Sequence, residues 1–352
     1  MIGTMTATKR ILFLGGSGVI SAATVQRAVE AGHEVTVLNR GTTTLRPLPD
    51  DVRRLTGDLR DPASLDAALA GQEFDVVAQF MAFTTEHVAA DVDRFDGRVG
   101  QYVFISSASA YQKPPARLPV TESTPLRNPF WQYSRDKAAC EDLLVAAYRD
   151  RGFPATIIRP SHTYDRTILP TLGGWTDVAR MRAGKPVVVH GDGTSLWTLT
   201  HAKDVAVGLA GLLGHPAATG EAFTLTGDHT PTWDQVYTWL GQAAGVEPEL
   251  VHVASETIAA AAPEHGPGLL GDKAHSMVFD NAKARALVPE FRTTTTYDEG
   301  AVEQVAWFDA HPHYQDVDPA FDALSDRLVA HARSIGPTAD GAAVRPPVSL
   351  AR

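Results

Sequence analysis

The sequence predicts an α/β protein with a doubly wound parallel sheet and a smaller C-terminal lobe. Within the first 160 residues, short strand-like segments alternate with segments of helical spacing. The strand-like segments are continuously apolar and β-branched, which is typical of a parallel sheet covered on both faces. After Pro160 the pattern changes to Pro- and Gly-rich segments with strand fragments and short helices. A length of 352 residues is enough for both units.

The predicted strands lie at residues 10–15, 34–38, 75–80, 102–106 and 155–159. A helical segment follows the first strand and stops at Gly32. Before the last of these strands we expect a helix that Asn128 caps and that begins with Pro129, because proline fits the first helical position. We place residues 8–165 in the sheet domain, with returning segments near 197–230, and residues 166–196 and 231–330 in the lobe. Residues 336–352 lack periodicity and are expected to form a mobile tail.

Composition excludes several classes of protein. Lys and Arg number 31 against 41 Asp and Glu, and this net charge of −10 argues against a nucleic-acid partner. The single cysteine, Cys140, leaves no intrachain disulfide, and the histidines show no metal-ligand spacing, so no metal is expected. Residues 1–9 lack the apolar core of a secretion signal, and no apolar run reaches the roughly 20 residues that span a bilayer. We therefore expect a cytoplasmic protein with no membrane partner.

A glycine-rich turn lies between the first strand and the first helix, where residues 15–21 read GGSGVIS. Glycines here allow a pyrophosphate to approach the backbone, and the helix N-terminus supplies N–H donors. Ser21 replaces the third glycine of the usual spacing, at a position that mainly sets helix packing. A plain turn is the alternative, but the place of the motif favours dinucleotide binding. The expected contacts are Gly15, Ser17, Gly18, Val19 and Ile20.

The end of the second strand bears on the choice between NAD and NADP. An acidic residue here would accept hydrogen bonds from the adenosine ribose of NAD, but this chain has Asn39 and Arg40. A guanidinium suits a 2′-phosphate. We therefore favour NADP, the alternative being that Arg40 is a solvated loop residue.

Tyr133 and Lys137 lie one helical turn apart and therefore on one face of the predicted helix. A lysine ammonium near a phenol lowers its pKa and makes the tyrosine a usable proton-transfer group. Alternatively, the pair is a surface cation beside a packed aromatic. The strand at 102–106 runs into Ser107, and the carboxyl ends of parallel strands line the ligand crevice. The order of glycine turn, serine and Tyr-x-x-x-Lys predicts an oxidoreductase.

These motifs make residues 9–310 resemble the extended short-chain dehydrogenase/reductase family, the NAD(P)-dependent sugar epimerases and dehydratases with a Rossmann-like domain. Further matching segments are GDLRD at 57–61, DVVAQFMA at 75–82, FISSASAY at 104–111 and the step from Arg159 to Pro160. The resemblance implies that Ser107 and Tyr133 hold a substrate hydroxyl and that Lys137 also binds the nicotinamide ribose. It also implies cofactor contacts at Asp58, Leu59, Phe80, Ala82, Pro160 and His162.

Departures from the family pattern reduce the number of reactions that we expect this chain to catalyse. Dehydratases of this family carry an Asp-Glu pair just after the catalytic serine position, where this chain has Ala108 and Ser109. No carboxylate is present for elimination, so dehydration is disfavoured, and so is decarboxylation. Epimerases of the UDP-galactose type have small residues here, as this chain does.

A second group of departures concerns the substrate. Trp197 stands where the family has an arginine for a nucleotide diphosphate, and only Lys273 and His275 lie near the later arginine position. An indole stacks on a sugar but cannot neutralise a diphosphate. We therefore expect a free or simply glycosylated sugar, or a nucleoside, unless Trp197 is a core aromatic. Because Gln79 and Met81 replace the common His and Ala, Phe83 and Thr84 are expected to face the substrate, with Ser109 and Trp197.

The leading hypothesis is an NAD(P)-dependent sugar epimerase that oxidises and re-reduces one hydroxyl-bearing carbon. The first alternative is an NADP-dependent reductase or dehydrogenase that releases its cofactor each turnover. The second is a non-enzymatic scaffold that binds nucleotide or RNA, because residues 38–41 and 279–291 resemble the branch with chloroplast stem-loop RNA-binding proteins. Family members commonly dimerise through helices that correspond to residues 85–98 and 130–149, so a homodimer is expected.

Overall fold

The first lobe is built on a seven-stranded sheet of order β10-β6-β5-β4-β1-β2-β3, in which every neighbouring pair is parallel. The computed structural model describes residues 8–41 and 45–334, so the expected tail at 336–352 lies outside the described residues. The strands are β1 (Arg10–Leu14), β2 (Glu34–Asn39), β3 (Arg53–Thr56), β4 (Val76–Gln79), β5 (Gln101–Ile105), β6 (Ala155–Pro160) and β10 (Ala222–Leu225). The direction of strand order reverses between β1 and β4. The doubly wound parallel sheet predicted from the sequence is confirmed.

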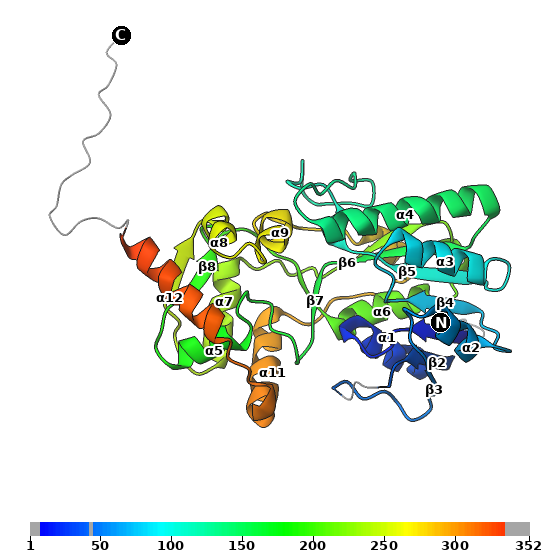
Figure 1. Ribbon diagram of the computed structural model, residues 1–352, viewed down its shortest axis with the longest axis horizontal. Helices are drawn as coiled ribbons and strands as arrows, with labels where there is room; N and C mark the ends of the chain where they lie inside the picture. The colour runs from blue at the N-terminus through cyan, green and yellow to red at the C-terminus, as the bar shows by residue number, and fades with distance from the viewer. Residues whose placement is uncertain (1–7, 42–44, 335–352) are drawn as a thin grey trace, which may run out of the picture.

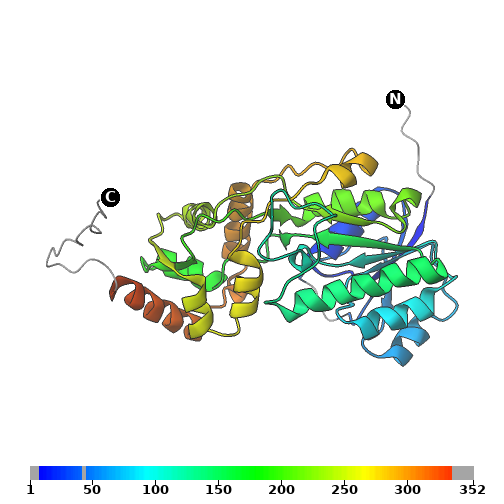
Figure 2. The same cartoon turned by 90° about the horizontal axis from the view of Figure 1, so that it is seen from above.

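Helices cover both faces of this sheet, as Figure 2 shows. One layer contains α1 (Val19–Glu30), α6 (Ala202–Leu212) and α10 (Ala282–Leu287), and the other contains α2 (Pro62–Leu69), α3 (Thr85–Phe95) and α4 (Gln132–Arg151). Side chains along β1 alternate between the layers, because successive residues of a strand point to opposite faces. Ile11 and Phe13 pack with the first layer, and Leu12 and Leu14 pack with the second. Burial of β1 on both faces explains its continuous apolar sequence.

The second lobe lies beside the first along the longest axis (Figure 1). Its core gathers large aromatic side chains, among them Trp175, Trp197 and Trp233. Two small parallel pairs, β7 with β9 and β8 with β11, complete the strands. The remaining elements are η1 (Ala108–Ala110), β7 (His162–Tyr164), α5 (Trp175–Arg182), β8 (Val187–His190), β9 (Leu199–His201), η2 (Pro216–Ala218), α7 (Trp233–Ala243), β11 (Leu250–Val253), α8 (Ser255–Ala261), α9 (Gly266–Gly268), η3 (Leu269–Lys273), α11 (Tyr297–Ala310), η4 (Pro312–Tyr314) and α12 (Pro319–Ser334).

The start of α4 differs from the prediction. The helix begins at Gln132 with Trp131 at its N-cap position, not at Asn128 and Pro129. The Asn128 amide instead donates to the backbone oxygens of Ser109 and Gly271, at 2.8 and 2.7 Å. Asn128 therefore joins the sheet domain to the second lobe rather than capping a helix.

The division of the chain also differs near α10, because residues 282–291, which we placed in the lobe, return to the sheet domain. Ala284, Val288 and Phe291 pack in the same core cluster as Ile11 and Phe13. Ala284 lies in α10, which packs against α6 and β10, and Val288 and Phe291 follow its C-terminus. Within the described ranges, no helix combines the length and apolarity that crossing a membrane requires.

Candidate active site

The glycine turn forms the floor of a cleft at the carboxyl ends of β1 and β2. Gly15 has φ +89°, and a Cβ atom placed on it would lie 2.3 Å from Met81 Cγ. A Cβ on Gly16 would lie 2.6 Å from Val37 Cγ1. The Ser21 hydroxyl accepts a hydrogen bond of 2.8 Å from the Gly18 N–H, so the serine at the third glycine position fastens the turn to the first turn of α1. A side chain at either glycine would collide with Met81 or Val37, so this turn requires glycine at both positions.

The cleft has a volume of about 590 Å³ and receives side chains from the carboxyl ends of several strands. Arg40, Arg46 and Arg60 line it on the side of β2 and β3, with Asp58 and Leu59. Arg40 is exposed, whereas Arg46 is paired with Asp165 at 2.5 Å. The glycine turn and the positive side chains that line the cleft fit a dinucleotide, because its pyrophosphate is anionic. The predicted cofactor residues that line this cleft are Gly15, Ser17, Gly18, Val19, Ile20, Asn39, Arg40, Asp58, Leu59, Phe80, Lys137 and Pro160.

Ser107, Tyr133 and Lys137 meet at the inner end of this cleft. Ser107 follows β5, while Tyr133 and Lys137 lie on one face of the first turns of α4. Lys137 Nζ donates to the backbone oxygens of Ala82 and Ile105, each at 2.8 Å, and lies 5.9 Å from the centre of the Tyr133 ring. The ends of β4 and β5 therefore hold the lysine in place beside the tyrosine.

A chain of hydroxyl groups adjoins this trio. Ser107 Oγ lies 2.9 Å from Ser109 Oγ, which in turn accepts a hydrogen bond of 2.8 Å from the Ser134 hydroxyl. The Ser109 N–H also donates to Ser107 Oγ at 3.1 Å. Ser109, which stands at one of the family's carboxylate positions, thus holds the Ser107 hydroxyl in place beside the tyrosine.

Burial dominates the pKa values of the trio. It lowers the pKa of Lys137 to about 8, with Cys140 and Glu141 acting in the opposite direction. It raises the pKa of Tyr133, and the hydrogen bond with Ser107 only partly offsets this. We expected Lys137 to lower the pKa of Tyr133, but the net shift is upward. Burial likewise raises the pKa of the Cys140 thiol to about 11, consistent with a packed residue and not a nucleophile.

A second cavity of about 300 Å³ opens between the trio and the second lobe, and we call it the lobe cavity. Ser107, Tyr133, Pro160 and Ser161 line both the cleft and the lobe cavity, so the tyrosine lies at their border. The other residues that line the lobe cavity are Ala108, Ser109, Trp131, His162, Trp197, Thr198, Asp272, Lys273, Met277 and Phe279. Of the residues expected to face the substrate, Ser109 and Trp197 are in this set.

Several predicted residues lie elsewhere. Phe83 lines the cleft and stacks near Lys137 Nζ, 4.8 Å from the ring centre, instead of lining the lobe cavity. Thr84 is the N-cap residue of α3 and lines neither space. Ala82 is buried beneath the cleft and contributes its carbonyl to Lys137. His162 lines the lobe cavity and not the cleft, because Trp197 Nε1 donates to its Nδ1 at 3.0 Å.

Trp131, Asp272, Met277 and Phe279 were missed as lining residues. Trp131 lies only two positions before Tyr133, so its place beside the tyrosine follows from the local chain, and the ring centres lie 5.1 Å apart. The other three come from the return of residues 272–279 to the site. No local pattern indicates that return.

A buried ionic group behind the trio was also missed. Arg159 Nη2 lies 2.6 Å from Glu141 Oε2, and the Glu141 carboxylate accepts a hydrogen bond from Ser106. The Arg159 guanidinium also donates to the Tyr111 hydroxyl at 3.0 Å. This network fixes the ends of β5 and β6 against α4, the elements that carry Ser107 and Lys137.

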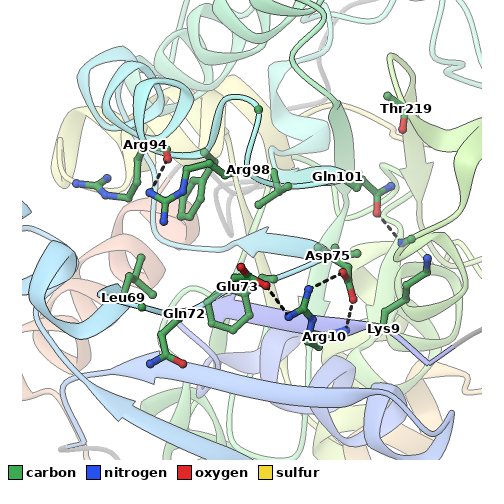
Figure 3. A pocket seen from close by; sticks show the side chains of 18 of the residues that line it. Lys9, Arg10, Leu69, Gln72, Glu73, Asp75, Arg94, Arg98, Gln101 and Thr219 are labelled. Carbon is green, nitrogen blue, oxygen red and sulfur yellow. Dashed lines mark hydrogen bonds and ion pairs between the residues drawn. The ribbon is translucent and has the colours of Figure 1, made fainter.

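A larger cavity, of about 1000 Å³, lies at the opposite edge of the sheet (Figure 3). Arg10, Val76 and Gln101 line it from the amino ends of their strands. Its charges are largely paired, as where Arg10 contacts Glu73 and Asp75 at 3.2 Å each. Ligands of open parallel sheets bind at the carboxyl edge, so the cleft beside Tyr133 is the better candidate. Among the described residues, no group of three His, Cys, Asp or Glu side chains is placed to hold a metal.

A seven-stranded parallel Rossmann-like sheet, a glycine cradle and a Ser-Tyr-Lys trio define the extended short-chain dehydrogenase/reductase type. The family model described as the NAD dependent epimerase/dehydratase family matches residues 11–97 and 92–225. The chain belongs to this family.

Known proteins similar to this chain differ in their reactions. It is 31% identical to the 2′-dehydrokanamycin reductase of Streptomyces kanamyceticus, over 81% of this chain and 80% of that protein. It is 28% identical to the chloroplast stem-loop binding protein of 41 kDa b of Arabidopsis thaliana, over 70% of this chain and 66% of that protein. An epimerase structure from Methanothermobacter thermautotrophicus superposes with a TM-score of 0.71 at 16% identity, covering 88% of this chain and 94% of that one. This last likeness concerns the fold alone.

Proposed function

We propose that this protein is an NAD(P)-dependent oxidoreductase that interconverts an alcohol and a ketone on a sugar. The observation that carries the proposal is the place of Tyr133 and Ser107 at the border of the cleft and the lobe cavity. A cofactor in the cleft and a sugar in the lobe cavity would meet at these two hydroxyl groups. The nicotinamide cofactor supplies a hydride acceptor, or in its reduced form a hydride donor.

In the proposed mechanism, Ser107 and Tyr133 bind the substrate oxygen from the lobe cavity side. In oxidation, the substrate O–H proton passes to Tyr133 as its carbon loses a hydride, and a ketone forms; reduction reverses both transfers. The burial that raises the pKa of Tyr133 favours its protonated form, which is the form that donates in reduction. The fixed Lys137 ammonium stabilises negative charge on the tyrosine oxygen when the proton leaves. Lys137 is also placed to bind the nicotinamide ribose.

Net reduction is the version of this reaction that the comparisons favour. The reductase relative matches most of both chains, whereas the UDP-glucose 4-epimerases of similar sequence match less than half of this chain. Among the described residues that line the lobe cavity there is no arginine to bind a nucleotide diphosphate. We therefore propose a substrate without a nucleotide diphosphate, and a preference for NADP(H) on the basis of Arg40. Epimerisation with a retained cofactor is the second candidate, because Ala108 and Ser109 place no carboxylate directly after Ser107, where dehydration would need one.

The test is turnover of a panel of neutral, amino-substituted and carboxylated keto-sugars and their alcohols, with NAD(H) and NADP(H). We expect Tyr133→Phe to reduce turnover by at least about 100-fold while leaving cofactor binding intact. Tyr148→Phe, on the exposed side of the same helix, is the matched control. Net consumption of NADPH supports the reductase. Conversion of an alcohol to its stereoisomer, with deuterium retained at the reacting carbon and no net change in NADPH, supports the epimerase. Unchanged turnover in Tyr133→Phe contradicts both.

We also propose that the chain forms a homodimer through α3 and α4, which pack side by side on one face of the sheet. Light scattering after gel filtration tests the dimer directly.

The Tyr133→Phe variant also tests the alternative that the protein is a non-enzymatic scaffold. An RNA- or nucleotide-binding scaffold would keep its binding in Tyr133→Phe and would show no turnover in the wild-type protein.

A further inference from the structure

We infer that Lys273 and His162 form a subsite for one carboxylate, so that the sugar substrate is a sugar acid. This inference rests on the proposed function, since it concerns what occupies the lobe cavity. It starts from the charges and hydrogen-bond donors that face the cavity.

Among the described residues, Lys273 is the only lysine or arginine that lines the lobe cavity. Its side chain has no hydrogen-bond or ion-pair partner within residues 8–41 and 45–334, and burial lowers its pKa. A half-buried ammonium without a partner is costly, and an anionic ligand would compensate it. The lysine also lines an adjoining space of about 420 Å³ that shares Trp131 and Tyr133, so Lys273 borders two open regions beside the tyrosine.

The neighbouring carboxylate of Asp272 is shared between two lysines. Its charge raises the pKa of Lys273, but less than burial lowers it. Asp272 Oδ1 lies 2.8 Å from the Nζ of Lys113, whose side chain is fully buried, although the contact is not aligned as a hydrogen bond. Lys113 and Lys273 together carry two positive charges against one on Asp272. The group therefore keeps a surplus of one positive charge, which a monoanionic ligand matches.

The backbone of Lys273 is held in place from the lobe. Its carbonyl oxygen lies 3.1 Å from His190 Nε2 and accepts a hydrogen bond of 3.2 Å from Trp233 Nε1. The rings of His190 and Trp233 are themselves in edge contact, with centres 4.7 Å apart. The position from which the lysine side chain extends is thus fixed before a ligand binds, which reduces the entropy cost of binding.

His162 supplies a second, neutral donor. The Trp197 N–H can only donate, so His162 Nδ1 is its acceptor and the ring proton lies on Nε2. Burial and the charge of Lys273 lower the pKa of His162 to about 3, which keeps this tautomer neutral near pH 7. Nε2 has no partner among the described residues and lies on a residue that lines the cavity. Trp197 is therefore a positioning residue, and it orients His162 instead of contacting a diphosphate.

One ammonium and one N–H donor match the two oxygens and single charge of a carboxylate. A phosphate dianion would leave one negative charge unbalanced, and the ammonium group of an amino sugar would be repelled. The volume of about 300 Å³ is at the lower end of ligand pockets and suits a single sugar ring.

Direct binding tests this inference without turnover. Isothermal titration at pH 7, with NADP⁺ present and absent, compares D-glucuronate and D-galacturonate with D-glucose, D-glucosamine, D-glucose 6-phosphate and inorganic phosphate. We expect at least one of the two uronates to bind at least about tenfold more tightly than any other probe, the advantage of a charge-assisted hydrogen bond. Lys273→Met should remove that preference and Lys273→Arg should retain much of it. Lys203→Met, which removes an exposed charge on α6, is the matched control and should bind as the wild type does.

Three results would overturn the subsite: no uronate preference in the wild type, a preference that survives in Lys273→Met, or tighter binding of phosphate or glucosamine. Failure of the proposed function looks different. Uronate binding without any NAD(P)-linked turnover would leave the subsite standing and remove the reaction. Turnover of neutral or amino sugars without uronate binding would support the reaction and remove the subsite.

Discussion

Lys137 is buried against carbonyl groups, and its exposed fraction is only 1%. Its ammonium is costly to the fold, because burial lowers its pKa from 10.5 to about 8. Between these values the unfolded chain binds more protons than the folded one, so stability rises with pH across this window. We expect the free energy of unfolding of the wild type to rise relative to Lys137→Met between pH 8 and 10.5, by up to on the order of 3 kcal/mol. Urea unfolding at several pH values measures this, and a difference independent of pH would contradict it.

The proposed preference for NADP(H) depends on Arg40. It is exposed at the end of the cleft beside Asn39, whose Oδ1 accepts a hydrogen bond of 2.9 Å from the Gly41 N–H. We expect Arg40→Ala to weaken NADP⁺ binding by about tenfold and NAD⁺ binding far less, since only NADP⁺ carries the 2′-phosphate. Arg27→Ala, an exposed arginine on α1, is the control in the same titrations. An equal loss of affinity for both cofactors would show that Arg40 does not contact the 2′-phosphate.

The sequence predicted the positions of those site residues that belong to a local motif. Tyr133 and Lys137 face the same way because helix geometry alone requires it, and Ser107 follows directly from the end of a strand. The place of His162 could not be predicted, because its ring orientation depends on Trp197, thirty-five positions along the chain. The upward pKa shift of Tyr133 was also unpredictable, because it depends on burial in the folded protein.

At the scale of elements, the turn between β1 and α1 depends on two properties of Gly15: its positive φ and its contact with Met81. Gly32 allows the two properties to be tested separately, because it also has a positive φ, +83°, but has open space around it. We expect Gly15→Ala and Gly32→Ala each to lose about 1–2 kcal/mol of stability from the left-handed conformation. Only Gly15→Ala should also weaken dinucleotide binding, since its methyl group displaces Met81 at the cleft floor. Thermal unfolding and cofactor titration of both variants measure this, and equal cofactor affinity would contradict it.

Elements with strong apolar patterns were predictable, and polar ones were not. β1, β2, β4, β5 and β6 are buried and were predicted from their apolar runs. β3 was missed because it is an edge strand whose residues, including Arg53 and Arg54, are largely exposed. The start of α4 was wrong because the Asn128 side chain, typical of a cap, is used in a contact between lobes.

In the whole molecule, the two lobes supply different parts of the candidate site. The sheet domain supplies the cleft and the trio, and the second lobe supplies Lys273, Met277 and Phe279 to the cavity beyond Tyr133. The sequence predicted the first of these in detail, since each motif follows a strand. It predicted little of the second, because the lobe cavity is formed by segments that are distant in sequence and meet only in the fold.

We expect the cleft beside Tyr133 to bind a nicotinamide dinucleotide. The most direct measurement is mass spectrometry of whatever the purified protein releases on denaturation, together with titration of the protein by NAD⁺ and NADP⁺. We predict one dinucleotide site per chain. A cofactor already bound at this stoichiometry would favour the epimerase, and reversible binding of added NADP⁺ would favour the reductase. A protein that releases no dinucleotide and binds neither cofactor at millimolar concentration would contradict the account.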